Sequence, residues 1–260
     1  MIGAIIGDII GSKYEFNNIR DKKFKLFSED CFATDDSIMT MAIMDMYNKG
    51  YLDNKEKIID TFKKWGNDYP GRGYGGRFLR WLVTDTRESY NSLGNGSAMR
   101  VSPIGWIANS EEEVKKYSYN VTSVTHDHIE GLKGAEVTAM CVYYARNKKS
   151  KEFIKEYVSE YYNLDFDYED LRKNYKFTEI CQDTVPQAIY CFLISDSFED
   201  CIRTVISIGG DCDTTAAIAV AIAGAYYGID KKIREKAYNY LDNNMKKVIE
   251  TFENKVNESK

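Results

Sequence analysis

Two short acidic clusters are the part of this chain best suited to carry chemistry. Residues 34–37 read Thr-Asp-Asp-Ser, and residues 211–215 read Asp-Cys-Asp-Thr-Thr. Each cluster combines two carboxylates with neighbouring hydroxyls, and hard divalent cations such as Mg²⁺ and Mn²⁺ prefer such oxygen ligands. Four carboxylates held close together repel one another unless cations neutralise them. We therefore expect a metal site if the fold brings the clusters together.

Helix capping offers a simpler explanation of both clusters. Each cluster precedes an apolar run with helical periodicity, and acidic or hydroxyl side chains stabilise the first turn of a helix. Capping accounts for only one or two of the four residues 34–37. On a helix, the side chains of the adjacent residues Asp35 and Asp36 would point in directions about 100° apart. That divergence suits two cations, or one cation and a substrate hydroxyl. The second cluster follows Gly209 and Gly210, which allow a tight backbone turn before a helix.

Two glycine-rich loops and a histidine pair are weaker signals. Residues 94–100 read Gly-Asn-Gly-Ser-Ala-Met-Arg, and residues 71–77 read Gly-Arg-Gly-Tyr-Gly-Gly-Arg. Bare amides in such loops can hold phosphate oxygens, although neither loop matches a P-loop or a dinucleotide fingerprint, and each alone is typical of a tight turn. His126 and His128 are too few for a histidine-rich zinc site, and we interpret them as a polar turn with His126 at most lining a pocket.

Helical periodicity dominates the segments that must position these residues. Residues 1–11 predict a buried apolar helix, and residues 214–228 carry small side chains all round, as a central helix does. We expect further helices where apolar residues recur at helical spacing: residues 36–49, 55–65, 112–123, 130–146, 151–162, 185–195 and 198–208.

The pattern predicts an all-α fold. No stretch shows the sustained alternation of a sheet strand, and no linker divides the chain, which has only three prolines. We expect a compact single-domain orthogonal helical bundle over residues 1–260, with a binuclear metal cleft. Residues 12–30 carry many charges and should form a surface loop of low local stability that serves as a lid. Residues 146–180 should cap the bundle at its surface.

Composition narrows the function classes. A formal net charge of -5 argues against a general nucleic-acid-binding surface. None of the six cysteines forms a CxxC pair with another. This spacing predicts buried free thiols in a reducing cytoplasm. No apolar run is long enough to predict a membrane span.

Motifs in chain order make the sequence resemble the ADP-ribosylglycohydrolases, relatives of the dinitrogenase-reductase-activating glycohydrolase. The similarity extends from residue 1 to about residue 230, and the ordered pair of acidic clusters is its most specific part. The matching motifs are residues 3–8 (GAIIGD), 14–15 (YE), 34–37 (TDDS), 72–75 (RGYG), 94–100 (GNGSAMR), 125–126 (TH), 185–190 (VPQAIY) and 209–214 (GGDCDT).

The resemblance implies an all-α fold that binds two Mg²⁺ ions, with Mn²⁺ as an alternative, in a cleft. Carried onto this chain, the implied metal ligands are Thr34, Asp35, Asp36, Asp211, Asp213 and Thr214. The implied catalytic residues are Asp36, Glu15 and Asp35, with Glu15 on the mobile segment that closes over the metals. The implied substrate-binding residues are Gly94, Asn95, Gly96, Ser97, His126 and Tyr74. Cys212 departs from the usual Asp-Thr-Asp pattern, at a position that need not supply a ligand.

The implied activity is hydrolysis of the glycosidic bond between ADP-ribose and a modified acceptor. Carboxylates can stabilise the oxocarbenium-like transition state, while metals orient the ribose hydroxyls and activate water. Residues 94–101 and 72–75 look closer to the serine-directed members, whereas arginine-linked protein, O-acetyl-ADP-ribose and ADP-ribosylated nucleic acid stay open as substrates. Two alternatives are a two-metal phosphohydrolase and a non-catalytic, crystallin-like relative that only binds ADP-ribose.

Overall fold

The computed structural model describes residues 1–259, which form fifteen α-helices and two 3₁₀-helices without a strand. The all-α fold expected from the periodicity is confirmed. The helices are α1 (Gly3–Gly11), α2 (Asp35–Lys49), α3 (Lys55–Asp68), α4 (Gly76–Val83), α5 (Gly96–Met99), α6 (Ser102–Ile107), α7 (Glu111–Thr122), α8 (Ile129–Arg146), α9 (Lys151–Ser159), α10 (Tyr168–Asn174), α11 (Val185–Ile194), α12 (Phe198–Ser207), α13 (Cys212–Tyr226), α14 (Lys231–Tyr238) and α15 (Asn243–Glu258), with 3₁₀-helices Ser12–Tyr14 and Cys181–Asp183.

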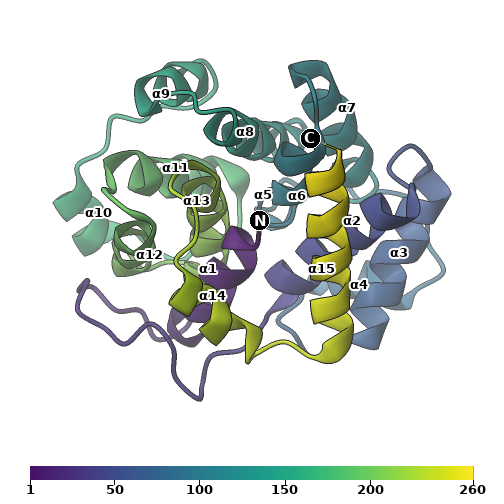
Figure 1. Cartoon of the computed structure of the whole chain (residues 1–260), viewed down its shortest axis with the longest axis horizontal. Helices are drawn as coiled ribbons and strands as arrows, with labels where there is room; N and C mark the ends of the chain where they lie inside the picture. Colours follow the sequence, from purple (N-terminus) through teal and green to yellow (C-terminus); the bar gives the residue numbers. More distant parts are fainter. Residues whose placement is uncertain (260) are drawn as a thin grey trace.

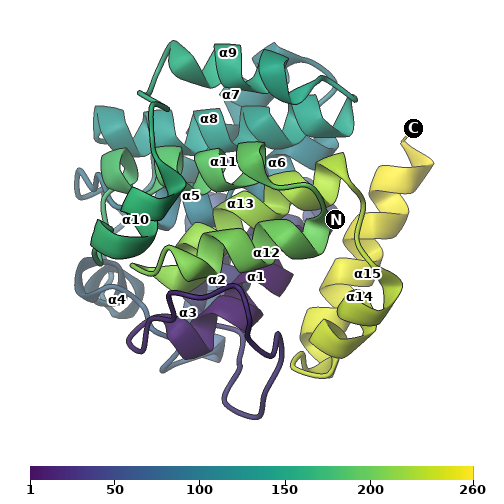
Figure 2. The ribbon, with the colours of Figure 1, turned by 90° about the vertical axis from the view of Figure 1, so that its left-hand side faces the viewer.

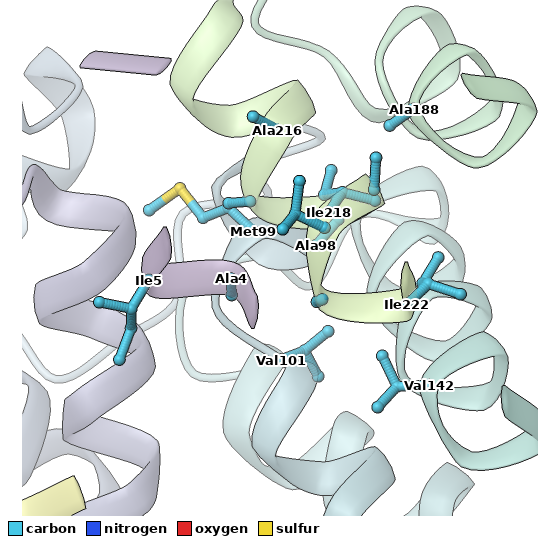
Figure 3. Packing of buried hydrophobic residues seen from close by; sticks show 14 of the residues in the cluster. Ala4, Ile5, Ala98, Met99, Val101, Val142, Ala188, Ala216, Ile218 and Ile222 are labelled. Atoms are coloured by element: carbon cyan, nitrogen blue, oxygen red, sulfur yellow. The ribbon is translucent and has the colours of Figure 1, made fainter. Parts of the chain in front are cut away.

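Helix α13 lies at the centre, as its small side chains predicted. It packs against α1, α8, α11 and α12, and all but its last residue is buried (Figure 2). Figure 3 shows Ile222 of α13 facing Val142 of α8 within this core. The small residues leave room for the neighbouring helices to approach the α13 backbone.

Helix α1 runs directly along α13 because glycines form its contact face. A Cβ atom added to Gly3 would lie 2.3 Å from the Val220 carbonyl oxygen, and one added to Gly7 would lie 2.3 Å from that of Ala216. No side chain fits at those distances, so the close approach of the two backbones requires glycine. The packing fixes Asp8 of α1 beside the first turn of α13.

The remaining helices surround this pair. Helix α2 packs against α1, α3 and α15, while α9 lies outside α8 (Figure 2). Helices α9 and α10 fall within residues 146–180, the region expected to cover the bundle surface. Residues 71–75 lead into α4, and residues 209–211 lead into α13. The other glycine-rich stretch, residues 94–100, is mostly helical, because α5 spans Gly96–Met99.

Residues 12–30 are tied to the body of the protein more firmly than their charge suggested. In Figure 1 this purple segment runs along the lower edge of the molecule. Lys22 forms a salt bridge of 3.0 Å to Asp200, and Arg203 donates hydrogen bonds of 2.8 Å to the backbone carbonyls of Lys22 and Phe24. The segment is therefore joined to α12 through Lys22 and through Arg203 of that helix.

The cysteines agree with a further expectation. All six cysteines are buried free thiols. Within residues 1–259, every helix is too short or too polar to cross a membrane.

Candidate functional site

The N-terminal ends of α2 and α13 meet, which brings the two acidic clusters together. The Thr214 hydroxyl on α13 donates to Oδ2 of Asp36 on α2 over 3.3 Å. Asp36, Asp211, Asp213 and Thr214 are each at most 5% exposed. Capping alone does not explain this arrangement. Thr34 does cap α2 by accepting from the Asp36 amide, but the side chain of Asp211 caps no amide at the start of α13.

Asp8 is a central member of the site that we did not predict as a functional residue. Its carboxylate accepts from the Thr34 hydroxyl at 2.6 Å, from the Thr34 amide at 3.0 Å and from the Ser37 amide at 3.1 Å. It is fully buried. A charged residue in the middle of the apolar helix of residues 3–11 was the available signal, because an aspartate is rarely buried unless it is paired or ligates a metal.

Two groups of carboxylates share Asp213. Oxygen atoms of Asp8, Asp36 and Asp213 lie within 4.8 Å of one another, and so do oxygens of Glu15, Asp211 and Asp213. Glu15, just after the 3₁₀-helix Ser12–Tyr14, is only half-buried and stands between the buried acids and solvent. This pair of overlapping groups is the geometry that a binuclear cation site would require.

Burial and mutual repulsion strongly disfavour the charged forms of these acids. Burial, followed by the charge of Asp213, raises the pKa of Asp8 to about 7 and that of Glu15 to about 8. The same two causes raise the pKa values of Asp35, Asp36 and Asp211 well above the ordinary range. In each case the neighbouring charges that raise the pKa are other carboxylates, so the acids face one another rather than a basic side chain.

These residues fit a divalent cation. Oδ1 of Asp36 is buried and has no hydrogen-bond partner within residues 1–259, although a buried oxygen of this kind normally has one. A hard cation would satisfy that oxygen and would neutralise the surrounding carboxylates. The donor set contains only carboxylates and hydroxyls, which favours Mg²⁺ or Mn²⁺ over zinc. Cys212 is buried beside the site, and burial followed by the charge of Asp213 raises the pKa of its thiol.

The acids form one side of a cleft with a volume of about 300 Å³. The glycine-rich segments 73–77 and 94–96 contribute to its wall. Arg77 is the exposed basic residue that lines it, and Phe177 stands at its rim, 45% exposed. The predicted site residues that line this cleft are Glu15, Asp35, Asp36, Gly94, Asn95, Gly96, His126, Asp211, Asp213 and Thr214.

The loop of residues 94–97 does not present a row of free amides. The Gly94 amide donates to Ser92 Oγ at 3.2 Å, the Asn95 amide to the Glu179 carbonyl at 2.8 Å, and the Ser97 amide to the Gly94 carbonyl at 3.3 Å. The contact between residues 94 and 180 is also an antiparallel bridge. Of the four amides that we expected to hold a diphosphate, only that of Gly96 therefore lacks an acceptor within residues 1–259.

The side chain of Asn95 serves the acidic cluster instead. Its Nδ2 donates to Asp211 Oδ2 over 2.7 Å and to the Thr184 hydroxyl over 3.2 Å. The bond to Asp211 crosses from the loop before α5 to the loop before α13. Asn95 consequently orients a carboxylate of the predicted metal site.

His126 is a neutral donor in the cleft wall. Burial, followed by the charge of Arg100, holds the pKa of His126 well below its usual value. Arg100 Nη2 lies 3.3 Å from His126 Nδ1 and can only donate, so Nδ1 accepts and the proton of the neutral ring sits on Nε2. That nitrogen faces the loop, because a Cβ added to Gly96 would lie 3.3 Å from it.

Three predicted residues lie behind the cleft rather than in its lining. The Thr34 hydroxyl is held by Asp8, and the Ser97 hydroxyl donates to the Gly94 carbonyl at 3.1 Å. The Tyr74 hydroxyl donates to the Tyr69 carbonyl at 2.9 Å. Tyr74 and Ser97 thus have internal hydrogen-bond partners, and they support the cleft wall from outside.

Comparison with known proteins gives consistent matches. A model of the ADP-ribosylglycohydrolase family matches residues 1–259. Human ADP-ribosylhydrolase ARH3 is 28% identical, over 89% of this chain and 85% of that protein. The ADP-ribosyl-[dinitrogen reductase] glycohydrolase of Rhodospirillum rubrum is 25% identical, over 76% of this chain and 69% of that protein. A solved structure described as an ADP-ribosylglycohydrolase-related protein complex aligns with a TM-score of 0.72 at 21% identity, covering 96% of this chain and 94% of that one.

Proposed function

Since the chain belongs to the ADP-ribosylglycohydrolase family, we propose that it hydrolyses the glycosidic bond between ADP-ribose and a modified acceptor in a reaction that depends on Mg²⁺. The observation that carries this proposal is the convergence of Asp8, Asp36 and Asp213 from three separate elements. Asp36 and Asp213 line the cleft, and Asp8 is buried beside them. A protein that had kept only the fold would have no need to hold three buried carboxylates within 4.8 Å of one another.

The acids would hold the cations in two groups. Asp36 and Asp213 would supply oxygens to one ion and Asp211 and Asp213 to the other, with Asp35 and the Thr214 hydroxyl completing the ligands. The Thr34 hydroxyl, predicted as a ligand, donates to Asp8 and would act through that carboxylate. Asp8 is already engaged by Thr34 and Ser37, so it would orient the N-terminus of α2 and contribute charge. When bound, the cations would supply Lewis-acid orientation of the ribose hydroxyls and a more acidic water.

Glu15 is the acid best placed to act on the bond being broken. It is half-buried, lines the cleft and lies beside Asp211 and Asp213, which are buried. Asp35 is also half-buried and lines the cleft, but it is outside both carboxylate groups that contain Asp213. A carboxylate in the position of Glu15 can hold or move a proton at the attacking water or at the leaving acceptor. Asp36, whose Oδ1 has no hydrogen-bond partner among residues 1–259, is the second residue that can orient water.

The opposite wall offers donors for the diphosphate. Three donors border the cleft: the Gly96 amide, the Nε2–H group of His126 and the exposed guanidinium of Arg77. Neutral His126, beside the Gly96 amide and the Arg77 guanidinium, can donate to a phosphate oxygen without adding a buried charge. We therefore infer that ADP-ribose lies with its ribose over the acids and its diphosphate along residues 94–96.

The acceptor is proposed to be serine on a protein, on the basis of the motifs at residues 94–101 and 72–75. The direct test supplies the protein and Mg²⁺ with peptides carrying serine-linked or arginine-linked ADP-ribose, and separately with O-acetyl-ADP-ribose, and identifies products by mass spectrometry. We expect intact ADP-ribose, fastest from the serine-linked peptide, and none in the presence of EDTA.

Other products would contradict the proposal. Release of AMP or phosphate would indicate phosphohydrolysis, and faster release from arginine or acetyl conjugates would reassign the acceptor. Binding of ADP-ribose without turnover of any substrate would indicate a non-catalytic relative.

A further inference from the structure

The carboxamide of Asn18 lies between the segment that carries Glu15 and the turn that leads into α13. Its Nδ2 donates to the backbone carbonyls of Tyr14 at 2.7 Å, Glu15 at 3.0 Å and Gly210 at 2.9 Å. Its Oδ1 accepts from the Gly210 amide at 2.8 Å. One side chain therefore holds the backbone of Glu15 and both polar backbone groups of Gly210.

Gly210 is a sensitive point for such a contact. Gly209 and Gly210 have φ values of 69° and 79°, which side-chain-bearing residues rarely adopt, and a Cβ on Gly210 would lie 2.4 Å from the Tyr175 ring. The next residue is Asp211, followed by Asp213 in the first turn of α13. The orientation of this glycine turn consequently sets where those two carboxylates point.

We propose that Asn18 is a positioning residue that fixes Glu15 relative to Asp211 and Asp213. This inference rests on the proposed function, in which Glu15 acts on the bond held over those acids. In this arrangement the bonds through Asn18 set the distance between the carboxylate of Glu15 and the carboxylates of Asp211 and Asp213. Misplacing a catalytic group by about 1 Å can cost a hundredfold in rate.

The chemistry of the position requires a carboxamide. Oδ1 of the carboxamide accepts from the Gly210 amide, while its two N–H groups are shared among the three nearby carbonyl oxygens. Aspartate would keep the acceptor but lose the donors, and it would add a charge near an acidic site. Cys212 Sγ, 3.5 Å from Nδ2, completes the surroundings of the amide group.

The chain offers a matched control and a reason to expect folded variants. Asn17 is the adjacent residue, is also exposed, and forms no side-chain hydrogen bond within residues 1–259. Arg20 separately ties the segment to the body, because its guanidinium donates to the carbonyls of Ile208 and of Tyr175, the latter at 2.8 Å. Removing the Asn18 carboxamide therefore leaves the segment attached through Arg20 and removes the bonds that join Tyr14 and Glu15 to Gly210.

The test compares Asn18→Ala with Asn17→Ala in the Mg²⁺-loaded protein. We expect Asn18→Ala to lower kcat by about tenfold or more while KM and the Kd for ADP-ribose stay near wild type, and Asn17→Ala to change neither. In a Glu15→Gln background, Asn18→Ala should cause little further loss, because residues that act through one another are not additive. A kcat unchanged by Asn18→Ala, or a full additional loss in the Glu15→Gln background, would overturn the proposal.

Hydrogen–deuterium exchange separates this inference from the proposed function. Asn18→Ala should accelerate exchange of the Gly210 amide, and Asn17→Ala should not, whether or not ADP-ribose is the substrate. If exchange behaves as expected but the wild-type protein hydrolyses no ADP-ribose conjugate, the contact stands and the proposed function fails. If Gly210 exchange is unaffected, the positioning role itself is wrong.

Discussion

Asp8 and Asp213 present carboxylate oxygens within 4.8 Å of one another, although they belong to helices near opposite ends of the sequence. Both side chains are buried, and the charge of Asp213 is the second cause, after burial, of the raised pKa of Asp8. The closeness follows from the packing of α1 against α13 through glycines. The core of the fold therefore forces a charge repulsion that a cation would relieve.

The stability of the metal-free protein should fall as pH rises. The folded pKa values of Asp8, about 7, and Glu15, about 8, exceed the values near 4 of an unfolded chain. Between about pH 4 and pH 8 the folded state thus binds more protons than the unfolded state, so the free energy of unfolding decreases with increasing pH. Thermal melts in EDTA should show Tm decreasing across this range. Saturating Mg²⁺ should flatten the dependence, and a metal-free Tm that rises with pH would exclude this linkage.

Replacing one acid of the cluster should separate activity from stability. Asp36→Asn or Asp213→Asn should reduce ADP-ribose release by about a hundredfold or more, because a ligand is lost and the sugar is misplaced. The metal-free variants should melt no lower than wild type, since one repulsive charge has gone. Kinetics with Mg²⁺ and melts in EDTA measure the two effects. Full activity in either variant would contradict the proposed roles.

Glu15→Ala should lower turnover more than affinity. The side chain lies at the border between the buried acids and solvent, where it can act on the bond being broken without forming the floor of the sugar site. We expect kcat to fall by about a hundredfold and the Kd for ADP-ribose to change little. Calorimetric titration with ADP-ribose and steady-state kinetics on serine-linked and arginine-linked peptides measure these quantities. Wild-type turnover on both substrates would remove Glu15 from the mechanism.

Gly7→Ala should destabilise the protein through the contact between α1 and α13. The added methyl group would lie 2.3 Å from the Ala216 carbonyl oxygen and would push the helices apart, at a cost of about 2 kcal/mol or more. Gly75→Ala is the matched control, because nothing lies within 4 Å of its added Cβ. Urea denaturation gives both free energies of unfolding. Equal stabilities for the two variants would show that the close approach is not needed.

Local sequence signals determined the helices and the chemical class of the site. The residue types of Thr34 and Asp36 predict the start of a helix, and the small residues of 214–228 predict a central helix. Both predictions are possible because capping and periodicity depend on residues only a few positions apart. The acidic clusters at these helix starts also carry the oxygen types that a hard cation prefers. For that reason the metal-binding character of the clusters could be predicted without the fold.

The tertiary structure decided which groups meet and which are already engaged. It placed Asp8 beneath the α2 N-terminus, turned the Asn95 side chain onto Asp211, and gave the Tyr74 hydroxyl an internal acceptor. It also paired three of the amides in residues 94–97 that were expected to face a ligand, and it placed Asn18 against Gly210. Such contacts join residues far apart in sequence. Spacing along the chain does not predict which hydrogen-bond donors and acceptors will be paired once the helices pack.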